Sequence, residues 1–410
     1  MNTIGKTTIT VYHIGKYHAV EFVVMATDVA PVLGLKSCLG MELIKRIYNV
    51  NTDEESADIL SDFDDVFQGL GCLDGEHHIY IDKTVKPVIH APRKIPVAIR
   101  DQVKSELDKL ESQGVIVKVN EPTEWVNSMV AVQSKGKIRI CLEPRDLNTA
   151  IQREHYPMKT VEDVTSNLTG AQKFSVLDAS QCFNQVKLDA ESSNLLTFNS
   201  PFGRYKYLRL AFGVKSAPEV VQRLLSQIFE DIEGVEVVID DILIWGKDEQ
   251  ENNERVRKVL QRAREKNLKL NKQKCQIGLN EVTYLGHKIT SGGIEPNVEL
   301  VNAILEMKRP ECKQDVQRFL GTVNYLSKFI PDMATLNKSL RELLEKDVAW
   351  HWSSAHETSF NELKVAITKA PVLRYYDQGK PLKLSVDASS EAIAGCLLQD
   401  NQPIGYVSKA

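Results

Sequence analysis

Two adjacent aspartates, Asp240 and Asp241, interrupt an otherwise apolar stretch at positions 235–246, VEVVIDDILIWG. The flanking apolar runs predict two buried strands, and neighbouring carboxylates in such surroundings repel one another and resist the loss of water. Asp is common in tight turns because its side chain bonds local backbone groups, but a two-residue hairpin turn favours Gly or Asn. The stretch alone leaves two interpretations open, turn chemistry and a functional site.

A third aspartate, Asp178, ends another apolar run, FSVLDASQCF, well upstream of Asp240. Two buried strands therefore each deliver an acid at one end. Convergent carboxylates lose their mutual repulsion when they share divalent cations, and oxygen ligands suit Mg²⁺. Two Mg²⁺ ions held in this way can activate an attacking hydroxyl and stabilise a leaving phosphate oxygen, which predicts phosphoryl or nucleotidyl transfer.

Composition agrees with an ordinary globular protein of two to four domains, since the 410 residues are 42% hydrophobic and 26% charged. No apolar run is long enough to span a membrane, and the N-terminus alternates like a strand, so we expect a cytoplasmic protein. The seven cysteines include no CxxC pair, which argues against a zinc site. Residues 1–90 carry a net charge of −6 and residues 91–410 a net charge of +2, so the later part would handle any polyanion.

Periodicity divides the chain into segments. Residues 7–25 alternate around a turn and predict a hairpin, and a domain boundary is expected near residue 52. Residues 53–76 hold nine acidic and no basic side chains, which indicates a solvated linker or surface helix. Further expected elements are a hairpin with a basic tip around Ser-Lys-Gly-Lys, a helix in SAPEVVQRLLSQIFEDI, a strand at 282–290, and helices at 98–113, 248–268, 297–307, 313–329 and 335–345.

The order of several motifs closely resembles the reverse transcriptase of gypsy-class long-terminal-repeat retrotransposons over residues 90–345. The motifs are GKIRICLEPRDLN, LDASQCFNQVKLD, TFNSPFGRYKYLRLAFG, SAPEVVQR, VIDDILIWG, LNKQKC and YLGHKI. The resemblance implies an α+β fold, a right-hand polymerase with fingers, a ferredoxin-like palm and a helical thumb, followed by a truncated ribonuclease H-like α/β domain.

The resemblance also implies an activity: an RNA-directed DNA polymerase that extends a primer with deoxynucleoside triphosphates on an RNA or DNA template. It would use two Mg²⁺ ions, with Mn²⁺ as an alternative, and would work in the cytoplasm, in a retroelement particle or in the nucleus. No membrane partner is expected.

Roles follow for particular residues that match the family motifs. Asp178, Asp240 and Asp241 match the catalytic, metal-binding aspartates. Residues matching the nucleotide site are Lys135, Lys137, Arg139, Phe183 and Phe212, and those matching the primer grip are Tyr284, Leu285, Gly286 and His287. Phe183 would exclude a ribose 2′-hydroxyl. Without the resemblance, a lone Phe or His in a strand indicates packing and a Lys-rich hairpin tip indicates a solvated surface.

Several positions depart from the family pattern. Val238 stands where the family usually has Tyr, Ala211 replaces Pro, Cys182 replaces Gly and Asn184 replaces a large aromatic residue. These changes favour an alternative function, a decayed or co-opted copy that keeps the fold and binds nucleic acid without efficient polymerisation.

The expected organisation has five parts. They are a partial retropepsin-like segment (1–52), an acidic linker (53–90), fingers and palm (91–290), a helical thumb and connection (291–345) and a truncated ribonuclease H-like domain (346–410). The chain contains no Asp-Thr-Gly or Asp-Ser-Gly, so we expect no proteolysis. Asp387 matches the first acidic position of ribonuclease H, but the further carboxylates of that site are missing before Ala410, so we expect no RNA hydrolysis.

Overall fold

The computed structural model describes residues 3–13, 16–25, 59–134, 136–390 and 392–410. The chain divides into two compact units, Met1–Thr52 and Asp53–Ala410. In the first unit, β1 (Thr3–His13) and β2 (Lys16–Met25) pair antiparallel. This confirms the predicted hairpin, whereas the rest of the protease-like segment lies outside the described residues.

The second unit contains a five-stranded sheet. Its spatial order is β3 (Ile116–Lys118), β8 (Gly203–Tyr207), β7 (Thr197–Ser200), β4 (Asn127–Ser134) and β5 (Lys137–Glu143). The predicted basic-tipped hairpin is the β4–β5 pair, and the predicted helix at 98–113 is α3 (Arg100–Ser112), which buries Val103, Leu107 and Leu110. Short helices accompany this sheet: η2 (Val97–Ile99), α4 (Leu147–Ala150) and α6 (Ala190–Leu195).

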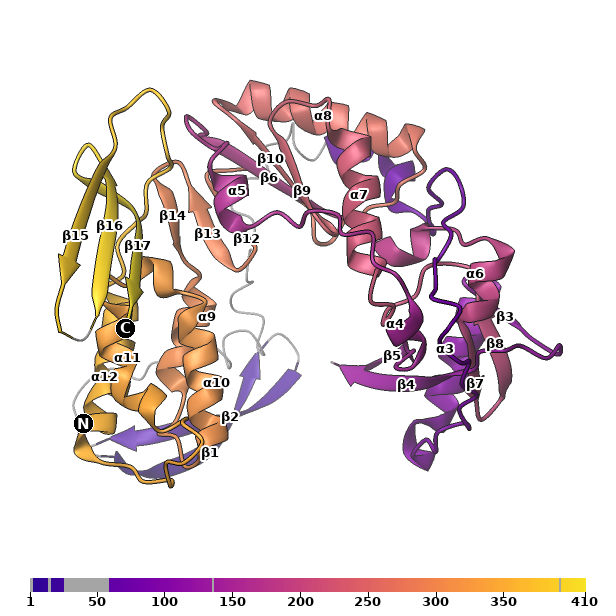
Figure 1. Ribbon diagram of the computed structural model, residues 1–410, viewed down its shortest axis with the longest axis horizontal. Coiled ribbons are helices and arrows are strands. Elements are labelled where there is room, and N and C mark those ends of the chain that lie inside the picture. Colours follow the sequence, from indigo (N-terminus) through magenta and orange to yellow (C-terminus); the bar gives the residue numbers. More distant parts are fainter. Residues whose placement is uncertain (1–2, 14–15, 26–58, 135, 391) are drawn as a thin grey trace. The chain divides into compact units, whose positions relative to one another are not determined.

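A four-stranded antiparallel sheet, here called the central sheet, positions the aspartates. Its order is β11 (Gln276–Leu279), β6 (Lys173–Asp178), β10 (Asp241–Gly246) and β9 (Val235–Val238). Two long helices, α7 (Ala217–Phe229) and α8 (Glu249–Glu265), pack against its strands (Figure 1).

Both faces of the central sheet are covered, which explains why its strands read as continuous apolar runs. Ile242 and Ile244 of β10 belong to the core cluster that includes α7 and α8, whereas Leu243 belongs to a second cluster. In β6, Leu177 joins the first cluster while Phe174 and Val176 join the second. The two-residue period of a strand thus sends alternate side chains into two different cores.

The second cluster joins the central sheet to a small sheet and a group of helices. The sheet is β12 (Glu281–Tyr284), β13 (His287–Thr290) and β14 (Gly293–Pro296). The helices are α9 (Val298–Glu306), α10 (Lys313–Asn324), η4 (Ser327–Phe329), α11 (Met333–Glu342) and α12 (Ser354–Thr368). The prediction of one strand at 282–290 is wrong in one respect, because a turn divides this segment into β12 and β13. The helix predicted at 313–329 ends at Asn324, and α12 was not expected.

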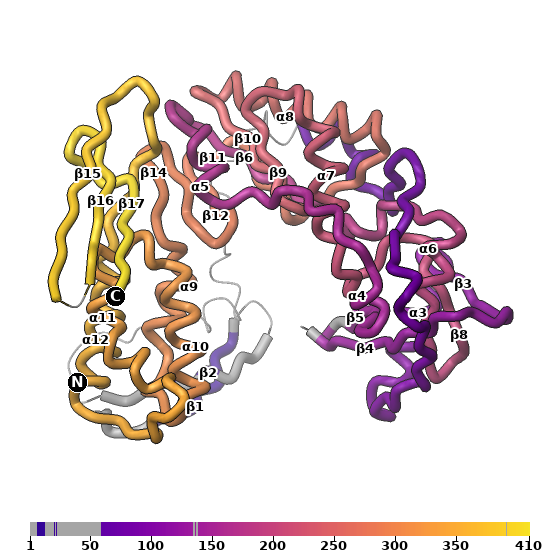
Figure 2. Tube along the Cα trace, in the orientation of Figure 1, coloured from indigo at the N-terminus to yellow at the C-terminus, as the bar shows by residue number. Residues whose placement is uncertain are grey.

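The chain passes between the five-stranded and central sheets more than once (Figure 2). It leaves β5, runs through the short helix α5 (Val161–Thr165) into β6, and then returns to form β7 and β8. It comes back to the central sheet through α7. Residues far apart in the sequence therefore meet along β6 and β10.

The acidic segment is not the free linker that its composition suggests. Residues 59–90 belong to the second unit, and Ile59, Val66, Leu73 and Ile79 are buried in its core. Its short helix η1 (Asp64–Phe67) pairs Asp64 with Lys272 and Asp65 with Arg264. Outside the helix, Asp62 pairs with Arg257 and Asp74 with Lys266. These acidic side chains stay more than half exposed while they pair with the basic ones, so the apolar side chains of the segment are the buried part.

A three-stranded antiparallel sheet ends the chain. It consists of β15 (Lys383–Ala388), β16 (Ile393–Gln399) and β17 (Gln402–Lys409). In the described part of the chain, no helix is long and apolar enough to cross a membrane.

Candidate active site

The strand register of the central sheet gathers the three aspartates at one edge. Asp178 is the last residue of β6, and its Cα partner across the sheet is Asp241, the first residue of β10. Asp241 is also the partner of Val238 at the end of β9, so Ile239 and Asp240 form a two-residue turn. The backbone N–H of Ala179 donates to the Asp240 carbonyl at 2.7 Å, which joins the turn to the end of β6.

The turn requires an unusual backbone conformation. Ile239 has a φ of +55°, a value that a β-branched residue rarely adopts and that carries a cost of about 1–3 kcal/mol. A positive φ at the first turn position is typical of the type II′ hairpin turn, where Gly is preferred. The surrounding contacts must therefore stabilise this turn.

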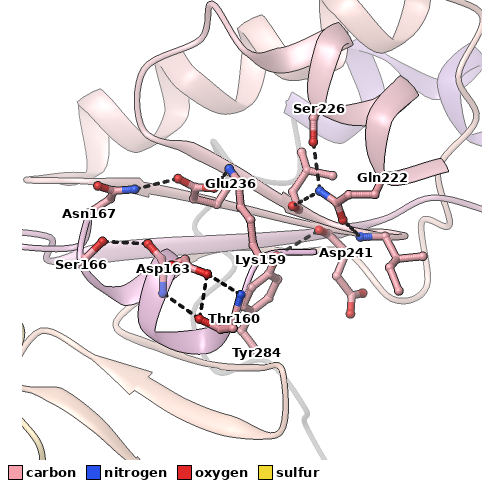
Figure 3. Close-up of polar contacts among 12 residues, drawn as sticks. Lys159, Thr160, Asp163, Ser166, Asn167, Gln222, Ser226, Glu236, Asp241 and Tyr284 are labelled. Carbon is pink, nitrogen blue, oxygen red and sulfur yellow. Dashed lines mark hydrogen bonds and ion pairs between the residues drawn. The ribbon is translucent and has the colours of Figure 1, made fainter. Parts of the chain in front are cut away.

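Gln222 of α7 supplies the first of these contacts (Figure 3). Its side chain is fully buried, and its Oε1 accepts a hydrogen bond from the Ile239 N–H at 2.7 Å. Its Nε2 donates to the Val237 carbonyl at 2.8 Å and to Ser226 Oγ at 2.9 Å. The sequence placed Gln222 on a helix without a role, because only the fold brings that helix against the turn.

Glu236 of β9 supplies a second contact (Figure 3). It is 7% exposed and accepts hydrogen bonds from Lys159 and, at 2.9 Å, from Asn167 Nδ2. Both partners flank α5, so the segment that leads into β6 is tied to the strand that leads into the turn. A buried carboxylate needs such partners, since an unpaired charge would be costly to desolvate.

Charge at the site is only partly compensated. Burial raises the pKa of Asp178, and the neighbouring Asp240 charge adds to the effect, while a hydrogen bond from Lys274 lowers it. Lys274 Nζ lies 2.5 Å from Asp178 Oδ2. Burial, and then the charges of Asp240 and Asp178, raise the pKa of Asp241 to about 6. One ammonium thus faces three carboxylates.

Lys274 is a site residue that sequence reasoning missed. It lies in the LNKQKC motif between α8 and β11, where a lysine is indistinguishable from an ordinary solvated charge. The loop is fixed by the Asn271 N–H, which donates to the Asp178 carbonyl at 2.8 Å. The position of Lys274 therefore depends on β6 itself.

The three carboxylates suit a hard divalent cation in donor type and in charge. Oxygen-only donors favour Mg²⁺ over softer metals, and burial together with mutual repulsion raises the carboxyl pKa values, a cost that a cation would offset. In the described residues, no group of three or more His, Cys, Asp or Glu side chains is arranged to hold a metal ion. The carboxylates therefore share one sheet edge without forming a finished coordination shell.

The predicted nucleotide-site residues divide into two groups. Phe183, in the short helix η3 (Cys182–Gln185), is 9% exposed and meets the edge of the Phe212 ring at a centroid distance of 4.5 Å. Phe212 is 48% exposed, so the pair presents an aromatic surface to solvent. Arg139 is exposed on β5 and Lys137 begins that strand, in the five-stranded sheet, whereas Lys135 lies outside the described residues.

The predicted primer-grip residues form a second tight turn. Leu285 and Gly286 have φ values of +45° and +66°, and Tyr284 is the Cα partner of His287 on either side of them. Positive φ at both central positions is typical of a type I′ turn. Tyr325, at the end of α10, donates its hydroxyl to the Leu285 carbonyl, and a Cβ on Gly286 would lie 3.0 Å from that hydroxyl oxygen.

His287 behaves as a packed ring. It is 1% exposed and stacks on Tyr325, with ring centroids 5.0 Å apart and an interplanar angle of 7°. Burial, assisted by the nearby Lys328 charge, lowers the pKa of His287 to about 4. The imidazole is therefore neutral near pH 7, in agreement with its interpretation as a structural residue.

Asp387 is exposed in β15, and its Oδ1 accepts a hydrogen bond from the Ala388 N–H at 2.9 Å.

The chain resembles known proteins in sequence and in fold. Residues 127–289 match the family model of the reverse transcriptase (RNA-dependent DNA polymerase), and residues 352–410 match the RNase H-like domain found in reverse transcriptase. The Transposon Tf2-3 and Tf2-7 polyproteins of Schizosaccharomyces pombe (strain 972 / ATCC 24843) are each 27% identical over 384 residues. The match covers 89% of this chain but only 28% of each polyprotein.

Solved structures share the fold. The foamy viral protease-reverse transcriptase in complex with double-stranded DNA has a TM-score of 0.82 at 21% identity, covering 99% of this chain and 76% of that one. The same viral protein in complex with an RNA/DNA hybrid has a TM-score of 0.80 at 20% identity, covering 100% and 61%. Residues 127–289 therefore resemble a reverse transcriptase domain, residues 352–410 resemble an RNase H-like domain, and the fold is that of the foamy viral protein.

Proposed function

We propose that this chain is an RNA-directed DNA polymerase that adds deoxynucleotides to a primer 3′ hydroxyl. The observation that carries the proposal is the register of the central sheet, which sets Asp241 opposite Asp178 and places Asp240 in the adjoining turn, within the reverse transcriptase match. The structural neighbours were solved with double-stranded DNA or an RNA/DNA hybrid, which supports a primer–template duplex as the partner.

The proposed chemistry assigns the metal to the three aspartates. Mg²⁺ held there, or Mn²⁺ in its place, would make the primer hydroxyl a better nucleophile and offset negative charge on the triphosphate. Asp178, Asp240 and Asp241 provide the oxygen donors, and the contacts of Gln222 and Glu236 keep the turn that carries them in place. Lys274 balances part of their charge before a cation binds.

The remaining residues would orient the substrates. The Phe183–Phe212 pair supports a deoxyribose and leaves no room for a 2′-hydroxyl, while Arg139, Lys137 and Lys135 hold the triphosphate through charge and hydrogen bonds. The turn of Leu285 and Gly286, flanked by Tyr284 and His287, lies at the primer end. Basic side chains of α11, such as Lys338 and Arg341, contact phosphates of the primer–template duplex without recognising its base sequence.

A second function is a protein that binds nucleic acid but polymerises poorly. Val238 is the observation that favours it, because the family places a phenol there and this chain places a buried aliphatic side chain. We also propose assignments for the two outer parts of the chain. The first unit derives from a retropepsin-like domain, and Asp387 is a remnant of a ribonuclease H site.

A template-directed incorporation assay tests the proposal. A labelled DNA primer on an RNA template is incubated with the protein, Mg²⁺ and one nucleoside triphosphate at a time. We expect extension only by the deoxynucleotide that complements the template base, and the same result on a DNA template. Stable primer–template binding with no extension by any of the four deoxynucleotides would instead establish the binding protein.

A further inference from the structure

The side chain of Tyr284 reaches from β12 to the backbone of the catalytic turn (Figure 3). The residue is 3% exposed, and its hydroxyl donates to the Asp241 carbonyl at 3.1 Å. Val238 and Asp241 are the Cα partners that close the turn, so the hydroxyl bonds one of the two residues that close it.

A buried side chain of this kind is not available to touch a primer. The phenol packs in the same core cluster as Val238 and Leu243, and burial followed by the Asp241 and Glu236 charges raises its pKa well above the ordinary value. The hydroxyl therefore stays protonated and remains a donor. Among the described contacts, its hydrogen bond is to the backbone of the turn, at the Asp241 carbonyl.

Leu285, the next residue, links Tyr284 to Tyr325 at the end of α10. The Leu285 carbonyl accepts the Tyr325 hydroxyl, and the His287 ring stacks on the Tyr325 ring. A continuous set of contacts thus runs from the end of α10, through the turn of Leu285 and Gly286, to the carbonyl of Asp241. Two tight turns with positive φ values are fixed to each other through one tyrosine side chain.

We propose that Tyr284 is a positioning residue that holds the Ile239–Asp240 turn in register with the Leu285–Gly286 turn. Its hydroxyl holds the carbonyl of Asp241, the residue that pairs with Val238 to close the turn, and so fixes where the Asp240 and Asp241 carboxylates stand relative to the primer end. The inference rests on the proposed polymerase function for its kinetic consequence, but the contact itself is a property of the fold. Position 238 can then be aliphatic, because a phenol reaches the turn from β12.

The chain offers a matched control for removing this hydroxyl. Tyr375 donates its hydroxyl to the Thr290 carbonyl at 2.6 Å and to the Gly293 carbonyl at 3.2 Å, in the β12–β14 sheet and away from the aspartates. Tyr284→Phe and Tyr375→Phe each delete one hydroxyl from a tyrosine that bonds sheet carbonyls. General loss of stability would affect both variants.

Two measurements are made on the whole chain. Hydrogen exchange of the peptide amides across residues 235–246 reports the turn, and single-turnover extension with a primer–template reports the chemical step. For Tyr284→Phe we expect faster exchange at Val238 to Ile242 and a single-turnover rate lowered about tenfold, with the deoxynucleotide dissociation constant within about twofold of wild type. Tyr375→Phe should leave all three values unchanged.

The outcomes separate this inference from the proposed function. Unchanged exchange in Tyr284→Phe overturns the inference, whatever happens to extension, and so does a rate loss that Tyr375→Phe reproduces. If the wild-type protein does not extend a primer at all, the polymerase proposal fails, while the exchange difference between the two variants still decides whether Tyr284 holds the turn.

Discussion

The ionisable side chains around the site respond differently to burial. Burial makes the carboxyls of Asp178 and Asp241 harder to ionise, and the mutual repulsion of the aspartates adds to this. Burial also makes the imidazole of His287 harder to protonate. These aspartates carry negative charge that a cation could offset, so burial there indicates a ligand site. The buried imidazole of His287 is neutral, so burial there indicates a structural role.

His287 gives stability a predictable dependence on pH. Its pKa is about 4 in the folded protein, whereas an unfolded histidine titrates near 6.5. Below pH 6.5 the unfolded chain takes up a proton that the folded chain refuses, so the free energy of unfolding falls by at most about 1.4 kcal/mol per pH unit between 6.5 and 4. Nearby Lys328 strengthens the effect and Glu162 opposes it.

Urea unfolding at pH 7 and pH 5 measures this contribution. His287→Phe keeps an aromatic ring against Tyr325 and should lose less stability on acidification than wild type. His351→Phe, at an exposed position, should follow wild type. Equal pH dependence in all three proteins would show that His287 does not titrate as described.

Phe183 should control the choice between deoxynucleotides and ribonucleotides. Its ring is held by the edge contact with Phe212, so Phe183→Val opens space for a 2′-hydroxyl without leaving a charged group unpaired. We expect the ratio of kcat/KM for a deoxynucleotide to kcat/KM for the ribonucleotide to fall by about 10- to 200-fold. An unchanged ratio would remove Phe183 from the sugar site.

At the scale of elements, the apolar strands and the turn between them were predictable, but their supports were not. Continuous apolar runs locate β9 and β10 in the sequence, and helical spacing locates α7, to within a few residues. The contacts of Gln222, Glu236, Lys274 and Tyr284 depend on which helix, loop or strand packs against the turn, and local periodicity does not contain that information. The packing of the acidic segment onto the second unit was missed for the same reason, because its basic partners lie about 200 positions away in the chain.

The buried Glu236 should make its partner lysine important for stability. Lys159→Met leaves the Glu236 carboxylate buried with only Asn167, which should cost about 2–4 kcal/mol of the free energy of unfolding. Lys104→Met is the control, because Lys104 pairs with the exposed Asp108 one helical turn away, and this change should cost much less stability than Lys159→Met. Denaturant unfolding measures both, and equal costs would contradict the importance of the Glu236 contact.

At the scale of the whole molecule, the sequence predicted the class of fold. It did not predict that residues 59–90 pack into the core of the second unit. The resemblance covered the strands and helices of both sheets, and the structural neighbours confirm that fold. The segment from 59 to 90 contributes five buried apolar side chains, Ile59, Phe63, Val66, Leu73 and Ile79, each worth about 1.5–3 kcal/mol. Their sum is comparable to the entire stability of a typical protein, about 5–15 kcal/mol.

Truncation distinguishes the two units. A chain of residues 53–410 should keep a cooperative thermal transition, because these residues form one compact unit. A chain of residues 91–410 should lose it, since Ile59, Val66, Leu73 and Ile79 would no longer cover the core. Differential scanning calorimetry compares the two, and a cooperative transition in the shorter chain would show that the acidic segment is dispensable.

The role of the three aspartates is tested most directly by single-turnover nucleotide incorporation in Mg²⁺. Asp178→Asn, Asp240→Asn and Asp241→Asn are compared with wild type and with Asp231→Asn, which removes an exposed carboxylate paired with Arg262. The geometry predicts that each of the first three changes lowers the rate about 100-fold or more, while Asp231→Asn stays within about twofold of wild type. Incorporation by Asp240→Asn at the wild-type rate would contradict the assignment of this sheet edge as the active site.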